Sequence, residues 1–100
     1  MYKMKQEITK SKTRTNFKQL SKELHDFEKK ANFDNTSTKQ LINWLEEEVQ
    51  NYKKAKSKVI KQNKLMDIIC LSIQISRREK MDLDQAWNRW WWKSNKYLKK

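Results

Sequence analysis

Apolar residues recur at spacings of three and four along most of the chain, which is the period of a helix that buries one face. The first apolar stripe consists of Phe17, Leu20, Leu24, Phe27 and Ala31. Asn16 lies directly before it and is a suitable N-cap, so the pattern predicts a first helix from this point. The polar segment 32–38, NFDNTST, ends the stripe, because Asn, Asp, Ser and Thr favour loops and caps.

A second helix should begin at Ser37, which forms a capping-box pattern with Gln40. Its apolar side contains Leu41, Leu45, Val49, Tyr52 and Val59. The segment 53–64 that follows holds six lysines. We expect this segment to be a frayed, basic helix end and a connection.

Two more helices are expected in the second half of the chain. The run from Leu65 to Ile75 is apolar on most sides, which is typical of a buried helix. The segment 77–81, RREKM, should link it to a fourth helix, where Asp82 and Gln85 repeat the capping pattern. The broad apolar face of that helix contains Leu83, Ala86, Trp87, Trp90, Trp91, Tyr97 and Leu98.

The composition strengthens the all-α prediction, because the chain has neither glycine nor proline. Hairpin turns that need positive φ are therefore disfavoured, and glycine-rich Walker or Rossmann phosphate loops are excluded. One hundred residues suffice for one domain. We expect residues 16–100 to form it and residues 1–15, with five basic residues and one acid, to form a flexible basic arm.

The formal net charge of +12 indicates a polyanionic partner. Nucleotides, nucleic acid and an acidic protein surface all satisfy it. The longest apolar run is about half a membrane span and is interrupted by Asp67, and the polar N-terminus does not resemble a signal peptide. We therefore expect a cytoplasmic protein with no membrane partner, in which the single cysteine, Cys70, is a buried and inert thiol.

Two acidic positions lie close to predicted core faces. On a helical wheel, Trp44, Glu47, Glu48 and Asn51 share one sector of about 100° beside the apolar stripe, while Glu46 points elsewhere. Asp67 has mostly apolar neighbours in the third helix. A carboxylate near a core is costly unless it is paired or bound to a cation. Two arrangements satisfy this: the acids pair with lysines, and Asp67 with Arg78 or a helix end, or they face each other and hold Mg²⁺.

The order of four segments, FKQLSKELHDF, LINWLEEEVQNYKKA, LMDIICLSIQIS and MDLDQAWNRWWWKSNKYL, resembles the MazG-like all-α nucleotide pyrophosphohydrolases, including small phage-type members. The likeness covers about residues 16–98 and implies a four-helix MazG-like bundle. In that family an E-E-x-x-E motif and an E-x-x-D motif bind Mg²⁺, which helps water cleave a nucleoside triphosphate between the α- and β-phosphorus. The wide apolar faces of so short a chain further predict that homodimerisation completes the bundle.

The resemblance places metal-ligand positions at Glu47, Glu48 and Asp67, but the two remaining acids are replaced by Asn51 and Lys64. An ammonium a few ångströms from Mg²⁺ repels it by several kcal/mol at an effective dielectric of about 20. Mg²⁺ binding should therefore be weak, and Lys64 is expected to hold phosphate directly. We expect binding of a nucleotide or other phosphorylated ligand without efficient hydrolysis, in a regulatory or phage-type counter-defence role.

Two other functions stay open. One is residual Mg²⁺-dependent pyrophosphohydrolysis through the surviving acids. The other is a small basic protein that binds nucleic acid, or inhibits a nucleic-acid enzyme, through its tails and fourth helix. That helix carries a basic strip for phosphate: Arg89, Lys93, Lys96 and Lys100.

Two tryptophans are candidates for base stacking. Trp92 lies beside the basic strip, outside the apolar face, and Trp44 lies beside the glutamates. Trp91 and Trp92 would alternatively be buried in a dimer interface. His25 has no Cys or His partner in the sequence, so a zinc site is not expected.

Overall fold

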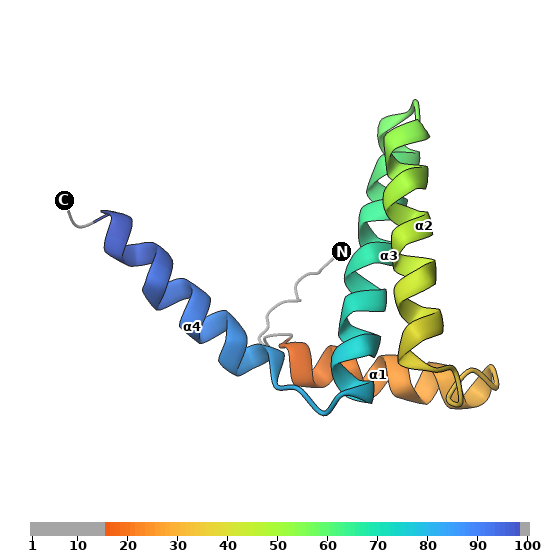
Figure 1. The fold of residues 1–100 in the computed structure, drawn as a ribbon, viewed down its shortest axis with the longest axis horizontal. Coiled ribbons are helices and arrows are strands. Elements are labelled where there is room, and N and C mark those ends of the chain that lie inside the picture. The colour runs from red at the N-terminus through yellow and green to blue at the C-terminus, as the bar shows by residue number, and fades with distance from the viewer. Residues whose placement is uncertain (1–15, 99–100) are drawn as a thin grey trace, which may run out of the picture.

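The computed structural model describes residues 16–98, which form four α-helices. These are α1 (Phe17–Lys30), α2 (Thr38–Lys54), α3 (Lys58–Arg78) and α4 (Leu83–Asn95), followed by the 3₁₀ turn η1 (Lys96–Leu98) (Figure 1). No strand occurs in this part of the chain, so the all-α prediction is confirmed there. The predicted basic arm 1–15 and Lys100 lie outside the described residues.

Each helix begins with a side chain that accepts a hydrogen bond from a backbone N–H of the first turn. Asn16 accepts from the Gln19 N–H at 2.8 Å, Ser37 from Gln40 at 3.1 Å and Asp82 from Gln85 at 3.1 Å. These three caps confirm the predicted helix starts. The fourth cap, Ser57, accepts from Ile60 at 3.1 Å and lies inside the segment that was expected to be a frayed connection.

The lysine-rich segment is mostly helical, so its prediction as a frayed connection was wrong. Helix α2 ends at Lys54, residues 55–57 make the turn, and α3 begins at Lys58 instead of Leu65. Val59 therefore belongs to α3 and not to the apolar side of the second helix. Lysine is a good helix former, and Ser57 caps the start of α3. Helix α3 also extends through Arg77 and Arg78, which were expected in a linker.

Asn32 and Lys80 adopt positive φ angles of 63° and 56° just beyond the ends of α1 and α3. Glycine usually occupies such a position, because it adopts positive φ without strain. This chain has no glycine, so Lys80 adopts the conformation instead. The Met81 N–H donates to the Ser76 carbonyl at 2.8 Å, which satisfies an acceptor at the end of α3. The turn at Lys80 directs the chain into α4.

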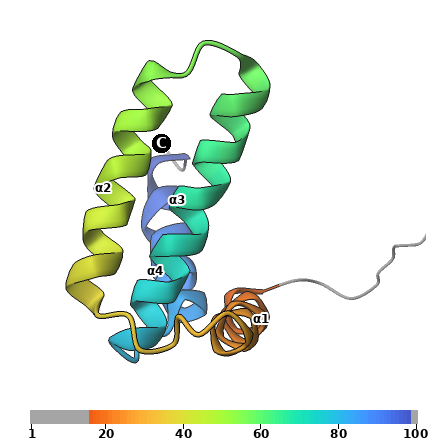
Figure 2. The same ribbon diagram turned by 90° about the vertical axis from the view of Figure 1, so that its right-hand side faces the viewer.

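Helices α2 and α3 form an antiparallel hairpin, and α1 crosses its base (Figures 1 and 2). Helix α4 contacts α1 and projects away from the hairpin (Figure 1). The four predicted helices are thus present, whereas completion of a bundle by a second copy stays a prediction. Among residues 16–98, no helix is long and apolar enough to cross a membrane.

The fully buried apolar residues are Leu41 on α2 and Ile73 on α3, 1% and 2% exposed. Phe27, which was predicted to belong to the buried stripe of α1, is exposed, and its neighbour Glu28 is buried instead. Helix α1 therefore packs on α3 through a side that includes a carboxylate. The guanidinium of Arg78 on α3 compensates this charge.

Candidate functional site

A pocket of about 370 Å³ lies between α2 and α3, and we call it the carboxylate pocket. Its lining residues are Trp44, Glu47 and Glu48 from α2, and Asp67, Cys70, Leu71 and Gln74 from α3. The two helices therefore bring together the three acids and the tryptophan that the sequence singled out. An antiparallel helix pair produces this juxtaposition because residues far apart in the chain lie at the same height along the hairpin.

Lys64 lies against two of these acids. Its Nζ is 3.3 Å from Glu48 Oε1, 3.5 Å from Glu48 Oε2 and 3.8 Å from Asp67 Oδ2. Its side chain is about 29% exposed, so the ammonium is partly shielded from water. Lys64 thus places a fixed positive charge next to the carboxyl pair, at the position where the resemblance implies an acidic metal ligand.

Asn51 also turns a donor toward Glu48. Its Nδ2 donates to Glu48 Oε1 at 2.7 Å. An asparagine can offer a metal ion only the oxygen of its amide, but the amide nitrogen of Asn51 is the atom that faces Glu48 here. Both residues that depart from the acidic motif therefore donate to the same carboxylate.

The two carboxyl groups have pKa values shifted in opposite directions. The pKa of Glu48 is lowered, chiefly because Asn51 donates to its carboxylate, with Asp67 and Lys64 adding to the effect and burial opposing it. The pKa of Asp67 is raised, chiefly by its hydrogen bond with Glu48, then by burial and the Glu48 charge, while Lys64 opposes the rise. A proton that enters this pair is therefore held by Asp67, and Glu48 keeps the negative charge.

This donor set does not fit a divalent metal ion as it stands. Mg²⁺ needs several oxygen ligands, whereas two nitrogen donors already engage Glu48. In the part of the chain that the structure describes, no group of three or more His, Cys, Asp or Glu side chains has the arrangement of a metal site. Binding of Mg²⁺ by Glu47, Glu48 and Asp67 stays a prediction from the resemblance. It requires the Lys64 side chain to move away from the two acids that it contacts, Glu48 and Asp67.

Cys70 lines the carboxylate pocket instead of lying deep in a core. Burial raises the pKa of its thiol, and the nearby Asp67 charge raises it further. The thiol is therefore protonated at neutral pH and a poor nucleophile. This fits the predicted lack of reactivity, although the side chain borders a pocket.

A buried ion pair that the sequence pattern did not predict lies next to the pocket, where Gln74 contacts it. Glu28 is 1% exposed and accepts hydrogen bonds from Arg78 Nη1 and Nη2 at 3.0 and 2.9 Å. Gln74 Nε2 donates to Glu28 Oε2 at 2.9 Å.

Arg78 also donates to the backbone carbonyls of Thr36 and Phe33 at 2.8 and 3.1 Å. Arg78 had been considered as a partner of Asp67, but it ties α1, the following loop and α3 together instead.

The contact with Glu28 fixes the orientation of Gln74 at the pocket. Because Nε2 is directed at Glu28, the amide oxygen of Gln74 is the atom left to accept from a ligand. A helical period places Glu28 at the edge of the predicted stripe, one residue after Phe27. The only sequence sign of this ion pair was therefore a single acid next to an apolar position, and spacing identified no partner for it.

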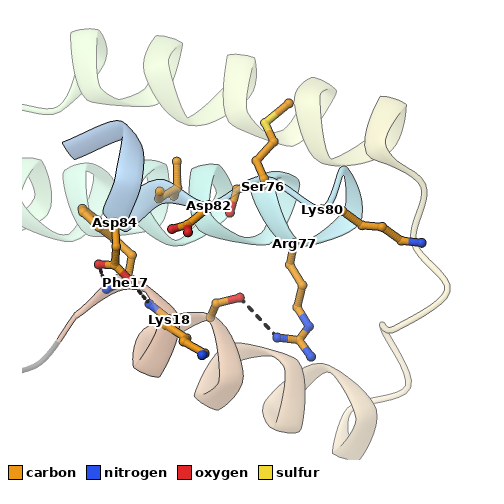
Figure 3. A pocket seen from close by; sticks show the side chains of 10 residues that line it. Phe17, Lys18, Ser76, Arg77, Lys80, Asp82 and Asp84 are labelled. Carbon is orange, nitrogen blue, oxygen red and sulfur yellow. Dashed lines mark hydrogen bonds between the residues drawn. The ribbon is translucent and has the colours of Figure 1, made fainter. Parts of the chain in front are cut away.

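A second pocket, of about 350 Å³, lies where the start of α1, the end of α3 and the start of α4 meet (Figure 3). Asp84 from α4 accepts from the backbone N–H groups of Phe17 and Lys18 at 3.0 and 3.1 Å. A carboxylate at a helix N-terminus is favourable because it satisfies unpaired N–H groups and faces the positive end of the helix dipole. On another wall, Arg77 Nη1 donates to Ser21 Oγ at 3.3 Å (Figure 3). This pocket is the junction that positions α4 on α1.

The other predicted binding residues lie on α4 and do not reach the carboxylate pocket. Arg89, Lys93, Lys96 and Trp92 lie on that helix and the turn that follows it, and none of them lines the pocket. Trp87 stacks on Trp90 with centroids 5.3 Å apart and on Trp91 at 6.0 Å, which makes one exposed aromatic face. His25 lies 3.9 Å from Glu28 and has no second metal-ligating neighbour among the described residues that would complete a site.

Comparisons with protein-family models, curated proteins and solved structures give no significant match to this chain. The geometry of the carboxylate pocket and the order of features in the sequence are therefore the basis for assigning a function.

Proposed function

We propose that the carboxylate pocket binds a nucleotide or a related phosphorylated ligand without efficient hydrolysis. One observation carries this proposal: Asn51 and Lys64, the two residues that depart from the acidic motif, both donate to Glu48. The chain thus supplies its own cation and hydrogen-bond donor at the place where a pyrophosphohydrolase needs metal ions. Such a pocket keeps the shape of a binding site and lacks the charge arrangement for metal-assisted water attack.

Each part of a nucleotide has a matching group in the pocket or directly beside it, where Lys64 contacts the lining residues Glu48 and Asp67. The Trp44 ring offers a face for base stacking, and the free oxygen of Gln74 and the Glu47 carboxylate can accept from the base edge. The phosphate belongs at the Lys64 end, because an ammonium has three N–H donors, of which one bonds Glu48 while Asp67 lies 3.8 Å away. The raised pKa of Asp67 reduces repulsion there whenever that group is protonated.

Residual Mg²⁺-dependent pyrophosphohydrolysis is the competing function at the same pocket. It requires Lys64 to swing away from Glu48 and Asp67, so that the two acids and Glu47 can face an ion. A regulatory or counter-defence role, in which the protein sequesters a nucleotide signal, fits binding without turnover and is proposed on the family resemblance alone.

Calorimetry against a panel of nucleoside triphosphates, cyclic nucleotides and other signalling nucleotides tests the proposal. We expect at least one of them to bind, and Trp44→Ala to weaken binding by about five- to 100-fold, the value of one base-stacking contact. Trp92→Ala is the matched control, since this exposed tryptophan lies outside the pocket. If no nucleotide binds, or if Trp92→Ala weakens binding as much as Trp44→Ala, the proposal is wrong.

The proposed positions of the lost metal ligands have their own test. The double variant Asn51→Glu with Lys64→Glu restores the acids that the resemblance implies and should gain Mg²⁺ affinity over the wild type. Asn51→Gln with Lys64→Met replaces the same two residues without adding acids and should show no gain. Equal Mg²⁺ affinity in the two double variants would mean that the alignment to the metal motif is incorrect.

We also propose that two copies of the chain associate through α4. Trp87, Trp90 and Trp91 are each about half exposed on one face of a helix that projects from the hairpin. Leu65, Met66 and Ile69 of α3 are exposed to a similar extent. A second copy of the same chain offers apolar surface of the right kind to cover both areas, and monomeric proteins rarely leave such areas open.

A further inference from the structure

Five lysines gather where α2 ends and α3 begins, at the turn of the hairpin (Figures 1 and 2). We call this group the lysine tip, and it consists of Lys53, Lys54, Lys56, Lys58 and Lys61. No aspartate or glutamate occurs between Glu48 and Asp67 in the sequence. The hairpin therefore carries its acids at the carboxylate pocket and an uncompensated positive charge at its end.

The lysine tip has no ionic partner within the described part of the chain. All five side chains are exposed, and none lies within ion-pair distance of a carboxylate among residues 16–98. Lys61 contacts an aromatic ring instead, with its Nζ 5.8 Å from the centroid of Tyr52. The long apolar stems hold the ammonium groups outward into solvent.

Part of this charge is unfavourable for the fold. Lys53 and Lys54 lie in the last turn of α2, where cations are stabilised by the helix dipole. Lys58 and Lys61 lie at the start of α3, the positive end of its dipole, and the first turn contains no acid. Five like charges around one turn also repel each other. A cluster of like charges that no carboxylate among residues 16–98 neutralises is typical of a functional site.

We propose that the lysine tip binds the phosphate backbone of nucleic acid. A compact group of ammonium ions on a rigid hairpin neutralises several phosphates at once and releases their counterions. Lysine contacts to phosphate carry no base information, so the binding is independent of sequence. Gln62 and Asn63 are exposed beside the tip and add amide groups that suit sugar and phosphate oxygens.

A nucleic acid fits this surface better than an anionic membrane does. Helical elements that bind membranes present large apolar side chains such as Trp, Phe or Leu next to their cations. The exposed apolar residues at the tip are Val59 and Ile60, and its aromatic residue, Tyr52, is half-buried beside Lys61. The lysines consequently dominate the surface.

The lysine tip is a separate site from the carboxylate pocket, since none of its lysines lines that pocket. Lys64, which belongs to the Glu48 cluster, is not part of it. Loss of nucleic-acid binding on mutation of the tip therefore leaves the nucleotide-binding proposal intact, and the converse also holds.

The test uses fluorescence anisotropy of the full chain with a labelled, random-sequence DNA duplex at several salt concentrations. We expect the wild-type affinity to fall steeply with salt. The triple variant Lys54→Gln, Lys56→Gln, Lys58→Gln should bind at least about tenfold more weakly, and its log–log salt slope should be less steep by up to about 2.7, which is about 0.9 for each phosphate that is no longer neutralised. Circular dichroism should show an unchanged helix content, because these side chains make no ionic contact in the described fold.

The control variant removes the same three charges from α1, with Lys22→Gln, Lys29→Gln and Lys30→Gln. It has the same net charge as the tip variant and should retain most of the wild-type affinity and salt slope. Equal loss in both triple variants would assign the binding to overall charge and overturn the proposal. Absence of duplex binding, combined with tip-dependent binding to vesicles of phosphatidylserine and phosphatidylcholine, would reassign the surface to membranes and also overturn it.

Discussion

Glu48 is the residue at which the acids of α2 and the cation of α3 meet. Its carboxylate accepts from Asn51 at 2.7 Å and has the Lys64 ammonium 3.3 Å away. The first contact is local, between residues one helical turn apart, and the second depends on the hairpin. The surroundings of the Glu48 carboxylate are therefore a product of both sequence spacing and tertiary packing.

Removal of the Lys64 charge should raise the pKa values of both neighbouring carboxyl groups. Lys64 lowers the pKa of Glu48 and of Asp67, so Lys64→Met, which keeps much of the side-chain length, takes away a stabilising charge from each anion. Carboxyl ¹³C NMR titration measures both pKa values directly. Lys58→Met is the control and should leave them unchanged, and unchanged values in Lys64→Met as well would contradict the observed contacts.

The two carboxyl groups give opposite contributions to the pH dependence of stability. Above the ordinary pKa of Asp67 and below its raised value, the folded chain holds a proton that the unfolded chain has released. The contribution of Asp67 to the free energy of unfolding therefore decreases as the pH rises through this window. Glu48, whose pKa is lowered, contributes stability that is lost as the pH falls through its titration.

Arg78 should be far more important for stability than its neighbour Arg77. Arg78→Met leaves the buried Glu28 carboxylate without its cation, which is expected to cost about 3–5 kcal/mol in the free energy of unfolding. Arg77 is exposed and makes one hydrogen bond at 3.3 Å, so Arg77→Met should cost less than about 1 kcal/mol. Urea denaturation of the two variants gives this comparison, and similar costs would show that the Glu28–Arg78 pair is not a stabilising contact.

The sequence predicted single residues well where one turn of helix decides their surroundings. Asn16, Ser37 and Asp82 were identified as caps because a cap depends on neighbours three residues away. Glu28 was missed because its partner Arg78 is fifty positions further along the chain. Spacing alone cannot reveal which of many basic residues a buried acid will meet.

Periodicity predicted the number of helices correctly. The residues at which the helices begin and end depend on the caps and turns between them. Helix α3 begins at Lys58 because Ser57 caps it, and the lysine content of the segment hid this start. Six lysines give the segment 53–64 the composition of a connection, although lysine has a good helix propensity. The facing of Glu48 and Asp67 across the helix pair was one of the two arrangements that the sequence left open, and the pairing of the acids with a lysine was the other.

Asp84 determines how α4 is attached to α1. Asp84→Ala removes the acceptor for the Phe17 and Lys18 N–H groups and should cost about 0.5–2 kcal/mol, as the loss of a helix cap does. Hydrogen exchange of these two amides should accelerate, together with that of the first turn of α4. Asp34→Ala, in an exposed loop that does not contact this junction, is the control. Unchanged exchange at Phe17 and Lys18 would show that Asp84 does not hold the two helices together.

At the scale of the whole molecule, charge and apolar surface are separated. The lysine tip lies at the end of the hairpin where α2 is joined to α3, and α4 projects away from the hairpin (Figure 1). The carboxylate pocket lies between α2 and α3, and the aromatic face lies on α4. The sequence indicated the basic charge and the tryptophans. The direction in which α4 leaves the hairpin depends on the Asp84 junction and on the turn at Lys80, and neither could be inferred from periodicity.

The aromatic face of α4 should control the oligomeric state. We expect the wild-type chain to be a dimer in size-exclusion chromatography with light scattering, and the double variant Trp87→Lys, Trp91→Lys to be a monomer, because buried lysines would lack partners in the interface. Trp92→Lys alters the opposite side of α4 and should remain a dimer. A monomeric wild type, or a dimer that persists in the double variant, would contradict association through this face.

Lys64 is proposed to take the place of a metal ion, so that the carboxylate pocket binds a nucleotide and does not turn it over. The decisive experiment is calorimetry with the tightest-binding nucleoside triphosphate, once in EDTA and once in Mg²⁺, with pyrophosphate release measured in the same samples. We predict similar affinity in both conditions and no enzymatic release of pyrophosphate. Binding that requires Mg²⁺, together with pyrophosphate release that disappears in Glu48→Gln, would contradict the claim and assign the protein to the active hydrolases.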